Sequence, residues 1–233
     1  MKTKDLIDDL ATRFEILDFT PNRVAGLARL KTFSGRAGDL YDRCRNYDLG
    51  AEQRSNVSAL SPWIRHRLIT ELEVLEVILE QHSFQTAESF VHEVFWRTYF
   101  KGWLEQHPGV WSSYQVGLRR QIKSVGKDRR LAANYTRAMV GETGIDCFDS
   151  WADELVRTGY LHNHARMWFA SIWIFTLQLP WELGADFFLR HLIDGDPASN
   201  TLAWRWVAGI QTKGRPYIAR ASNIAKFTNQ KFC

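Results

Sequence analysis

Hydrophobic residues recur along much of the chain at spacings of three and four positions. The spacing is clearest over residues 68–79, 90–104, 151–156 and 161–179, and it places apolar side chains on one face of an α-helix. No run of alternating apolar and polar residues indicates a β-strand. The pattern therefore predicts an all-α protein.

Prolines and glycines mark the expected ends of these helices. Pro108 and Gly109 close a helix that opens near Thr86, and Pro180 stops a long helix that begins near Tyr160. Proline ends a helix because it lacks a backbone N–H and its ring clashes with the preceding turn. The chain has no Gly-x-Gly-x-x-Gly motif, no Walker loop and no internal repeat, so any nucleotide would bind without a Rossmann unit.

The composition indicates one soluble domain. With 233 residues, of which 45% are hydrophobic, the chain can bury a core of its own, and we expect a single domain over residues 1–233. The first residues are too acidic for a signal or transit peptide, and no stretch of about 18 uninterrupted apolar residues could span a membrane. We expect a cytoplasmic protein with no membrane partner; the oligomeric state is open, with a monomer favoured.

The cysteines favour neither disulfides nor a metal site. Cys44, Cys147 and Cys233 are odd in number, widely spaced and without a CxxC pair. We therefore expect reduced, structural cysteines and no bound metal.

Charge and tryptophan content point to possible ligands. The net charge is +4, no acidic residue follows Asp196, and residues 119–130 hold six positive side chains against Asp128 alone. Such runs attract phosphate backbones, although a solvated surface is the commoner explanation of a single run. Ten tryptophans are more unusual, because they indicate a stacking surface, an aromatic-lined pocket or a route for electrons.

Residues 192–206 form the most informative segment. Two carboxylates around a glycine are followed by an asparagine and two tryptophans: Asp194, Gly195, Asp196, Asn200, Trp204 and Trp206. Such a turn accepts hydrogen bonds, and aromatic rings beside it suit a flat, partly polar ligand. The alternative is a capped loop followed by a buried aromatic helix. A calcium-binding EF-hand is excluded, because the loop lacks the glycine and the glutamate that this motif requires.

A polar helical face lies within the segment HEVFWRTYF. Glu93, Trp96 and Arg97 are spaced to share this face, where Glu93 and Arg97 would by default form a surface ion pair worth roughly 0.3–0.5 kcal/mol. His92 and Glu93 do not begin a zinc-protease motif, because Trp96 stands where the second histidine is needed.

A second polar face combines Asn163, Arg166 and Met167 near the start of an apolar helix. A buried guanidinium without a carboxylate would cost several kcal/mol, so we expect Asp194 to pair with Arg166. The pair could equally be structural.

Taken together, these segments resemble the flavin-binding helical domain of the photolyase and cryptochrome family. The resemblance covers residues 41–217, with residues 1–40 as a helical lead-in, and its motifs occur in the order of the family: YDRCR, VSALSPWI, HEVFWRTYF, TGIDCFDSWADELVRTGYLHNHARM and LIDGDPASNTLAWRW. It implies an all-α domain that holds FAD at the bottom of a cavity.

The resemblance also implies which residues bind FAD. One group would line the phosphates and the ribityl chain: Tyr41, Ser58, Leu60 and Ser61. A second group would surround the isoalloxazine ring, with Arg166 paired to Asp194, Asp196 at the polar edge and Asn200 near N5: Arg166, Asp194, Gly195, Asp196 and Asn200. The protein would tune and orient the cofactor.

The implied activity is that of a deoxyribodipyrimidine photolyase, a carbon–carbon lyase. Excited reduced FAD would donate an electron to a flipped cyclobutane pyrimidine dimer, and the electron would return after the bonds split. The implied contacts to the dimer and its phosphates are Arg45, Glu93, Trp96, Asn163, His164, Met167 and Trp206. Trp204 and Trp181 match the first two members of the electron-transfer chain, and the third could be Trp103, Trp111 or Trp173. The residues expected to act in catalysis are Glu93, Asn163, Asn200, Trp204 and Trp181.

Several positions depart from the family pattern. Val57 and Ala59 replace a hydroxyl and a basic residue of the phosphate motif, and His164 replaces an arginine. Because the match begins near the start of the sequence, we expect no antenna domain, and light capture would then rest on FAD alone. Weaker phosphate anchoring and a preference for single-stranded DNA are expected. Three other functions stay open: a cryptochrome-like blue-light photoreceptor, a lyase for (6-4) photoproducts that uses His164, and a helical nucleic-acid-binding protein without flavin.

Overall fold

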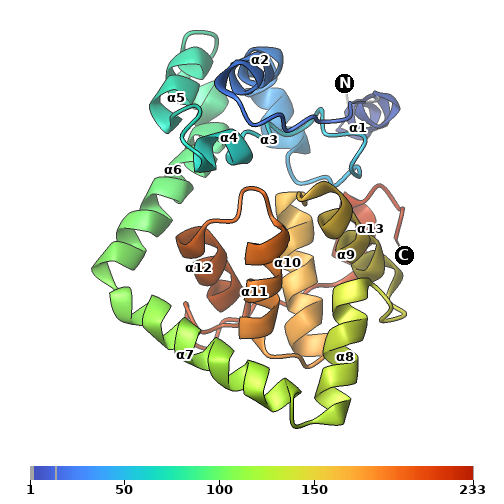
Figure 1. Ribbon diagram of the computed structural model, residues 1–233. Coiled ribbons are helices and arrows are strands. Elements are labelled where there is room, and N and C mark those ends of the chain that lie inside the picture. The colour runs from blue at the N-terminus through green and yellow to red at the C-terminus, as the bar shows by residue number, and fades with distance from the viewer. Residues whose placement is uncertain (1–2, 14, 233) are drawn as a thin grey trace. The chain divides into compact units, whose positions relative to one another are not determined.

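The computed structural model describes residues 3–13 and 15–232. Within these residues the chain is helical, and its β pairing is limited to one isolated bridge between Glu15 and Gln53. The all-α prediction is confirmed (Figure 1). In the same described residues, no helix combines the length and the apolar character that crossing a membrane requires.

The chain divides into two compact units. Unit 1 comprises Met1–Tyr99 and Phe227–Asn229, and unit 2 comprises Phe100–Lys226 and Gln230–Cys233. The single domain expected from the chain length stays a prediction.

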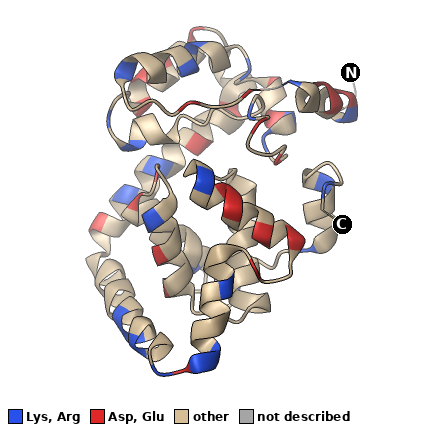
Figure 2. Ribbon diagram, turned by 45° about the vertical axis from the view of Figure 1, so that its right-hand side comes forward, with Lys and Arg blue, Asp and Glu red and all other residues tan. Residues whose placement is uncertain are grey.

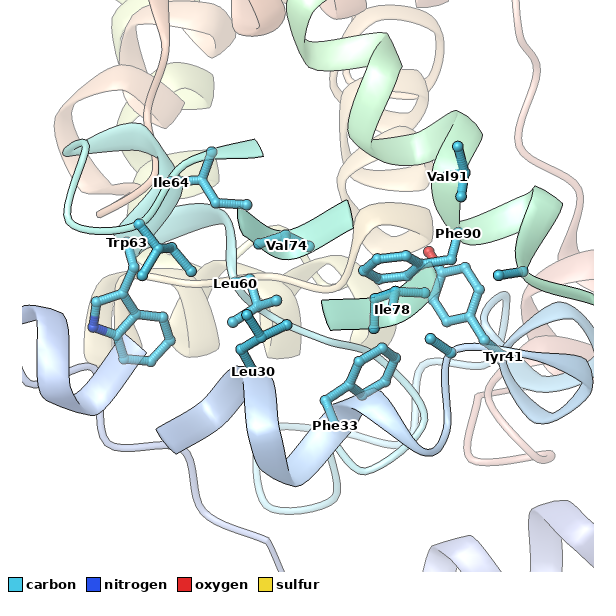
Figure 3. Packing of buried hydrophobic residues seen from close by; sticks show 13 residues of the cluster. Leu30, Phe33, Tyr41, Leu60, Trp63, Ile64, Val74, Ile78, Phe90 and Val91 are labelled. Atoms are coloured by element: carbon cyan, nitrogen blue, oxygen red, sulfur yellow. The ribbon is translucent and has the colours of Figure 1, made fainter. Parts of the chain in front are cut away.

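Unit 1 contains a large hydrophobic cluster and a smaller one around Ile7, Leu10 and Cys44. Its helices are α1 (Thr3–Thr12), α2 (Arg23–Ser34), α3 (Asp39–Cys44), α4 (Ser61–Arg65), α5 (Glu71–Leu79) and the first part of α6 (Phe84–Gln106). Helix α2 packs on α5, and the rings of Phe33, Tyr41 and Phe90 meet with centroids 5.2–6.0 Å apart (Figure 3). Leu30 and Ile78 belong to the same cluster, together with Val74 of the apolar pattern expected over residues 68–79.

A capping box decides where α5 begins. The apolar pattern starts at Leu68, but the helix starts at Glu71, because the Thr70 hydroxyl accepts from the Glu73 N–H while Glu73 accepts from the Thr70 N–H. Hydrogen bonds from Arg23 and from Thr70 lower the pKa of Glu73 to about 2.

Acid should therefore weaken unit 1 in a defined pH window. Because the folded pKa of Glu73 lies below its ordinary value of 4.5, its contribution is complete above pH 4.5 and is lost as pH falls toward 2. In the Glu73→Gln variant, urea unfolding at pH 7 and pH 3 should differ less than in the wild type. Glu76→Gln on the same helix is the control, and an unchanged pH difference in Glu73→Gln would contradict the assignment.

Unit 2 consists of helices stacked on one another. They are α7 (Pro108–Val125), α8 (Arg129–Val140), α9 (Asp146–Thr158), α10 (Asn163–Ser171), α11 (Trp181–His191), α12 (Pro197–Val207) and α13 (Ala221–Phe227), with a π-helical segment η1 (Ile172–Thr176) after α10. Helices α10 and α11 flank α12, α7 packs on α11 and α12, and α8 contacts both α7 and α9 (Figure 1). Pro108 closes α6 as predicted and also opens α7.

The long helix predicted from Tyr160 to Pro180 is interrupted. Helix α10 begins at Asn163, and from Ile172 the backbone widens into a π-helix, in which the Leu177 N–H donates to the Ile172 carbonyl. Gln178 then adopts a positive φ of 52°. A wider turn of this kind accommodates one extra residue and rotates the side chains that follow, which a regular helical period does not predict.

Aromatic rings fill the interior of unit 2. Trp151, Trp168, Trp173 and Trp204 are each at most 2% exposed. Trp151 stacks on Trp168 with centroids 5.4 Å apart, and Trp173 meets Trp204 edge to face at 6.2 Å. Part of the high tryptophan content therefore serves packing.

Candidate functional site

A cavity of about 160 Å³ lies within unit 2. Nine of its lining residues are ones that the sequence singled out, and they come from α10, from α12 and from the turn before α12: Asn163, Arg166, Met167, Asp194, Gly195, Asp196, Asn200, Trp204 and Trp206. The structure thus brings two separate segments of the chain together around one hollow.

The ion pair expected between Arg166 and Asp194 is present. Arg166 Nη2 lies 2.9 Å from Asp194 Oδ2, and the Asp194 side chain is 3% exposed. Arg166 Nε also donates to the Leu161 carbonyl at 2.9 Å, and its guanidinium lies over the Tyr160 ring. Several contacts therefore hold this arginine in one orientation, so that α10 and the acidic turn form one wall.

Asp196 and Asn200 connect the turn to its neighbouring helices. Asp196 Oδ1 caps α12 by accepting from the Ala198 and Ser199 N–H groups, each at 3.0 Å, and Oδ2 lies 3.8 Å from Lys101 Nζ. Asn200 Nδ2 donates to the Ala185 carbonyl at 2.8 Å. The capped loop and buried helix considered as an alternative are therefore present, and the cavity exists beside them.

The two tryptophans of α12 have different environments. Trp204 is buried, and a Cβ on Gly184 would lie 2.3 Å from its Cη2 atom, so the indole packs directly on the α11 backbone. Trp206 is 38% exposed and stacks on Tyr217 with centroids 5.4 Å apart. Trp204 is thus a fixed wall, whereas Trp206 keeps an accessible face.

Two buried polar atoms in the cavity wall indicate a polar ligand. Within the described residues, Ser199 Oγ and Trp204 Nε1 have no hydrogen-bond partner, although both residues line the cavity. Buried polar groups are almost always paired in native proteins, so a ligand that pairs with them would remove a cost of about 1–3 kcal/mol each. Ligand pockets usually measure roughly 300–1,000 Å³, so this smaller cavity would hold part of a dinucleotide rather than all of it.

Other lining residues were missed in the sequence. Ser199, Ala203 and Val207 line the cavity at intervals of four residues, together with Ala170 and Phe188. The interval of four along α12 was a usable signal, because it marks one helical face.

The predicted phosphate-binding residues lie in unit 1. Tyr41 and Leu60 belong to the hydrophobic cluster, and Ser61 is the first residue of α4. The carbonyl of Ser58 accepts from Arg29 Nε at 2.7 Å. Their roles toward FAD stay predictions.

Arg29 organises this loop and was not singled out in the sequence. It is 7% exposed, and its guanidinium donates to the carbonyls of Arg54 and Val57 as well as that of Ser58. It also pairs with Glu15. Burial would raise the pKa of Glu15, but hydrogen bonds and charge from Arg36 and Arg29 lower it. A basic side chain therefore supports the segment in which Ala59 adopts a positive φ of 49°.

Two predicted DNA contacts of unit 1 pair with each other. Arg45 Nη1 lies 2.6 Å from Glu93 Oε1, with 30% and 36% of the side chains exposed. Arg97 was predicted to pair with Glu93. Its Nε instead lies 3.5 Å from Glu71 Oε1, because α5 supplies a nearer carboxylate. Trp96 is 50% exposed and meets Tyr99 edge to face.

His164 and Trp181 lie outside the cavity wall. The His164 ring stacks on Trp168 with centroids 4.2 Å apart. The ring of Trp181 packs on that of Tyr114 with centroids 5.5 Å apart, and Tyr114 packs on Trp111 with centroids 5.2 Å apart. In the described part of the chain, no ring contact joins Trp181 to Trp204, so their predicted sequence in electron transfer stays a prediction.

The described cysteines are free thiols. Cys44 is buried and Cys147 is partly buried, and burial raises the pKa of both; Cys233 lies outside the described residues. No group of three or more His, Cys, Asp or Glu side chains is placed to hold a metal ion among residues 3–13 and 15–232.

Comparison with known proteins gives a consistent result. The family described as the FAD binding domain of DNA photolyase matches residues 90–231. A deoxyribodipyrimidine photo-lyase of Synechococcus sp. is 28% identical over 216 residues, covering 89% of this chain and 43% of the relative. A cryptochrome DASH of Natronomonas pharaonis is 32% identical over 208 residues, which cover 86% of this chain and 42% of that relative. The chain spans less than half the length of these curated relatives.

Solved structures show the same helical arrangement. A Synechocystis sp. cryptochrome aligns with a TM-score of 0.73 and 25% identity, over 93% of this chain and 45% of that one. The similarity confirms the fold that the sequence motifs implied.

Proposed function

Because the chain belongs to the family of FAD-binding domains of DNA photolyase, we propose that it uses FAD and light to split cyclobutane pyrimidine dimers in DNA. The observation that carries the proposal is the cavity of unit 2, on which nine residues selected by resemblance converge. An acidic turn alone would not carry the proposal, since such a turn also serves as a helix cap. A cavity alone would not carry it either.

FAD, when bound, supplies the electron chemistry, and the residues of the cavity position it. The pair of Arg166 and Asp194 holds the turn against α10. Ser199 Oγ and Trp204 Nε1 provide polar atoms at the wall. The hydrogen bond from Asn200 to the Ala185 carbonyl fixes the orientation of its amide, which would then contact a bound ring.

Three lining residues that keep exposed surface offer groups suited to a flipped dimer beside a bound ring. Asn163 can hydrogen-bond a base edge, Met167 is apolar and adaptable, and Trp206 keeps an exposed indole face. A cross-linked dinucleotide stacks poorly in DNA, so extruding it costs less than extruding a normal pair, and an aromatic face replaces the lost stacking. Single-stranded DNA would demand still less energy.

Arg45 and Glu93 would exchange their mutual ion pair for contacts to DNA. Their ion pair at 2.6 Å holds the Glu93 carboxylate while no DNA is bound. A phosphate is a strong competing partner for an arginine, so DNA binding at Arg45 would release Glu93 to hydrogen-bond the dimer.

Basic residues supply the remaining attraction for DNA. Lysines and arginines gather along α7 and the start of α8 (Figure 2), and they are Arg119, Arg120, Lys123, Lys127, Arg129 and Arg130. Contacts of this kind bind the phosphate backbone without reading its sequence, and they weaken as salt rises.

A cryptochrome-like photoreceptor is the second candidate. The 32% identity to a cryptochrome DASH favours it, because photoreduction needs the cofactor cavity but no lesion contacts. A (6-4) lyase is less favoured, since the stacking of His164 on Trp168 places its ring outside the cavity wall.

The proposal predicts light-dependent repair that depends on Glu93. FAD-loaded protein with reductant and blue light should restore oligonucleotides that carry one cyclobutane dimer, single-stranded ones fastest. Glu93→Gln should lower the repair yield about tenfold or more, because a hydrogen bond to a charged group contributes about 1.5–3 kcal/mol. Chromatography of the oligonucleotides measures the yield.

Glu88→Gln is the matched control. It is an exposed glutamate of the same helix α6, and its change should leave repair intact. Wild-type protein that retains FAD, becomes photoreduced and leaves dimers unchanged would reject the lyase in favour of the photoreceptor.

A further inference from the structure

The charged side chains that line the cavity do not balance one another. Among the described lining residues they are Arg166, Asp194 and Asp196. Arg166 pairs with Asp194 at 2.9 Å, so these two opposite charges compensate each other. The carboxylate of Asp196 therefore leaves the cavity wall with one negative charge in excess.

Both oxygens of the Asp196 carboxylate have partners outside the cavity. Oδ1 accepts from the N–H groups of Ala198 and Ser199, so the start of α12 faces it with a partial positive charge. Oδ2 lies 3.8 Å from Lys101 Nζ, and the side chains of Asp196 and Lys101 are 6% and 27% exposed. Lys101 therefore adds a full positive charge beside the excess negative charge of the wall.

Lys101 reaches this carboxylate from a different helix. It belongs to α6, and its neighbour in the chain, Phe100, lines the cavity. Successive side chains of an α-helix point about 100° apart, so the helix that turns Phe100 toward the cavity places Lys101 beside it. Lys101 is largely buried, whereas Lys213 of the same unit is exposed. Water and salt screen a largely buried charge much less than an exposed one.

The charge of an isoalloxazine ring depends on its redox state. The oxidised ring is neutral, whereas uptake of two electrons and one proton leaves a reduced ring with one negative charge. A negative charge in the cavity wall opposes this change, and a positive charge nearby favours it. The phosphates of FAD are negative in both states, so their contribution is the same before and after reduction.

We propose that Lys101 is a positioning residue that acts through Asp196 and favours the reduced, negatively charged form of the bound flavin. Its ammonium group holds Oδ2 of Asp196 and compensates the excess charge of the cavity wall. The inference rests on the flavin site of the proposed function. It does not depend on the lesion, so its test contains no DNA.

The first measurement compares the two redox forms of FAD in the wild type and in Lys101→Met, in the dark. Fluorescence titration gives the affinity for oxidised FAD, and stepwise reduction with dithionite beside a reference dye gives the reduction potential. We expect the affinity for oxidised FAD to stay near that of the wild type. The affinity for reduced FAD should fall about tenfold, because loss of a neighbouring opposite charge shifts such an equilibrium by roughly that factor or more. For a two-electron couple, this corresponds to a potential about 30 mV more negative.

A pH titration of the reduced protein provides the second measurement. The absorbance of the reduced ring changes when the ring takes up a further proton and becomes neutral. Without the positive charge of Lys101, the neutral form gains relative to the negative one. The pKa of the reduced ring should therefore be about one unit higher in Lys101→Met, which is the same tenfold factor.

Two control variants separate charge from packing. Lys101→Arg keeps the positive charge, so the potential and the pKa of the reduced ring should stay near those of the wild type. Lys213→Met removes an exposed charge and should leave both unchanged. A shift in Lys101→Arg as large as that in Lys101→Met would overturn the proposal, and so would an equal loss of affinity for both redox forms.

The outcomes for Lys101 and for the lyase are distinguishable. An unchanged potential in Lys101→Met overturns the role of this lysine, even where the wild type repairs dimers. The expected shift in a protein that repairs no dimers overturns only the lyase. If Lys101→Met does not fold, Lys101→Gln takes its place, since it also removes the charge but keeps a polar end, and the same outcomes decide.

Discussion

Replacing Asp194 with alanine is expected to lower the free energy of unfolding by about 2–4 kcal/mol and to reduce the FAD content together with it. The Asp194 side chain is 3% exposed and lies 2.9 Å from Arg166, so its removal takes the carboxylate away from a guanidinium that is only 23% exposed. The same residue forms the cavity wall. Urea unfolding and the ratio of flavin to protein absorbance measure the two effects.

Asp153→Ala provides the matched control. This aspartate pairs with Arg157 at 3.6 Å on the surface of α9, where 73% of its side chain is exposed. Exposed ion pairs contribute about 0–1 kcal/mol, so the free energy of unfolding and the FAD content of this variant should both stay near those of the wild type. Equal losses in the two variants would show that burial of the Arg166 pair has no special effect.

The second large effect is expected from Gly184→Ala. The added methyl group would lie 2.3 Å from Trp204 Cη2 and 3.0 Å from Trp173 Cε2, far inside the contact distance. Because both indoles are buried, they cannot move without repacking the aromatic interior, at a cost of about 1–3 kcal/mol. Displacing Trp204 also changes the cavity wall, so we expect a lower melting temperature and weaker FAD binding, measured by calorimetry and by titration.

Gly102→Ala tests whether steric contact is the cause. Gly102 is also a helical glycine, in α6, but apart from its chain neighbours and its own helix backbone no described atom lies within 4 Å of a Cβ built there. Alanine is favoured over glycine in a helix, so this variant should be more stable by up to about 1 kcal/mol. A loss of stability in Gly102→Ala similar to that in Gly184→Ala would contradict the packing argument.

The apolar spacing predicted the helices because helical geometry is local. An interval of three or four residues places side chains on one face whatever the rest of the chain does. For the same reason, the turn at Asp194 and the helix with Asn200 and Trp204 could be assigned to one cavity. These residues lie close in sequence, and α12 begins directly after Asp196.

Pairing between segments was predicted only where charge demanded it. Arg166 required a carboxylate, and Asp194 was a suitable one. For Glu93, the spacing of four residues along one helix named Arg97, but the structure pairs Glu93 with Arg45 and Arg97 with Glu71. An exposed charge accepts several partners at similar cost, so its choice depends on which helix packs nearby.

The amino-acid sequence alone determined that the chain is helical and that Arg166 needs an acid, and it predicted that the acidic turn and the helix after it line one cavity. Only the tertiary structure decided the π-helical turn that places Trp173 against Trp204, and the contact of Tyr135 with Trp173. Helical hydrogen bonds and side-chain periodicity act over a few residues. Contacts between residues far apart in the chain depend on how whole helices pack, and the residues next to a position in the sequence do not determine that packing.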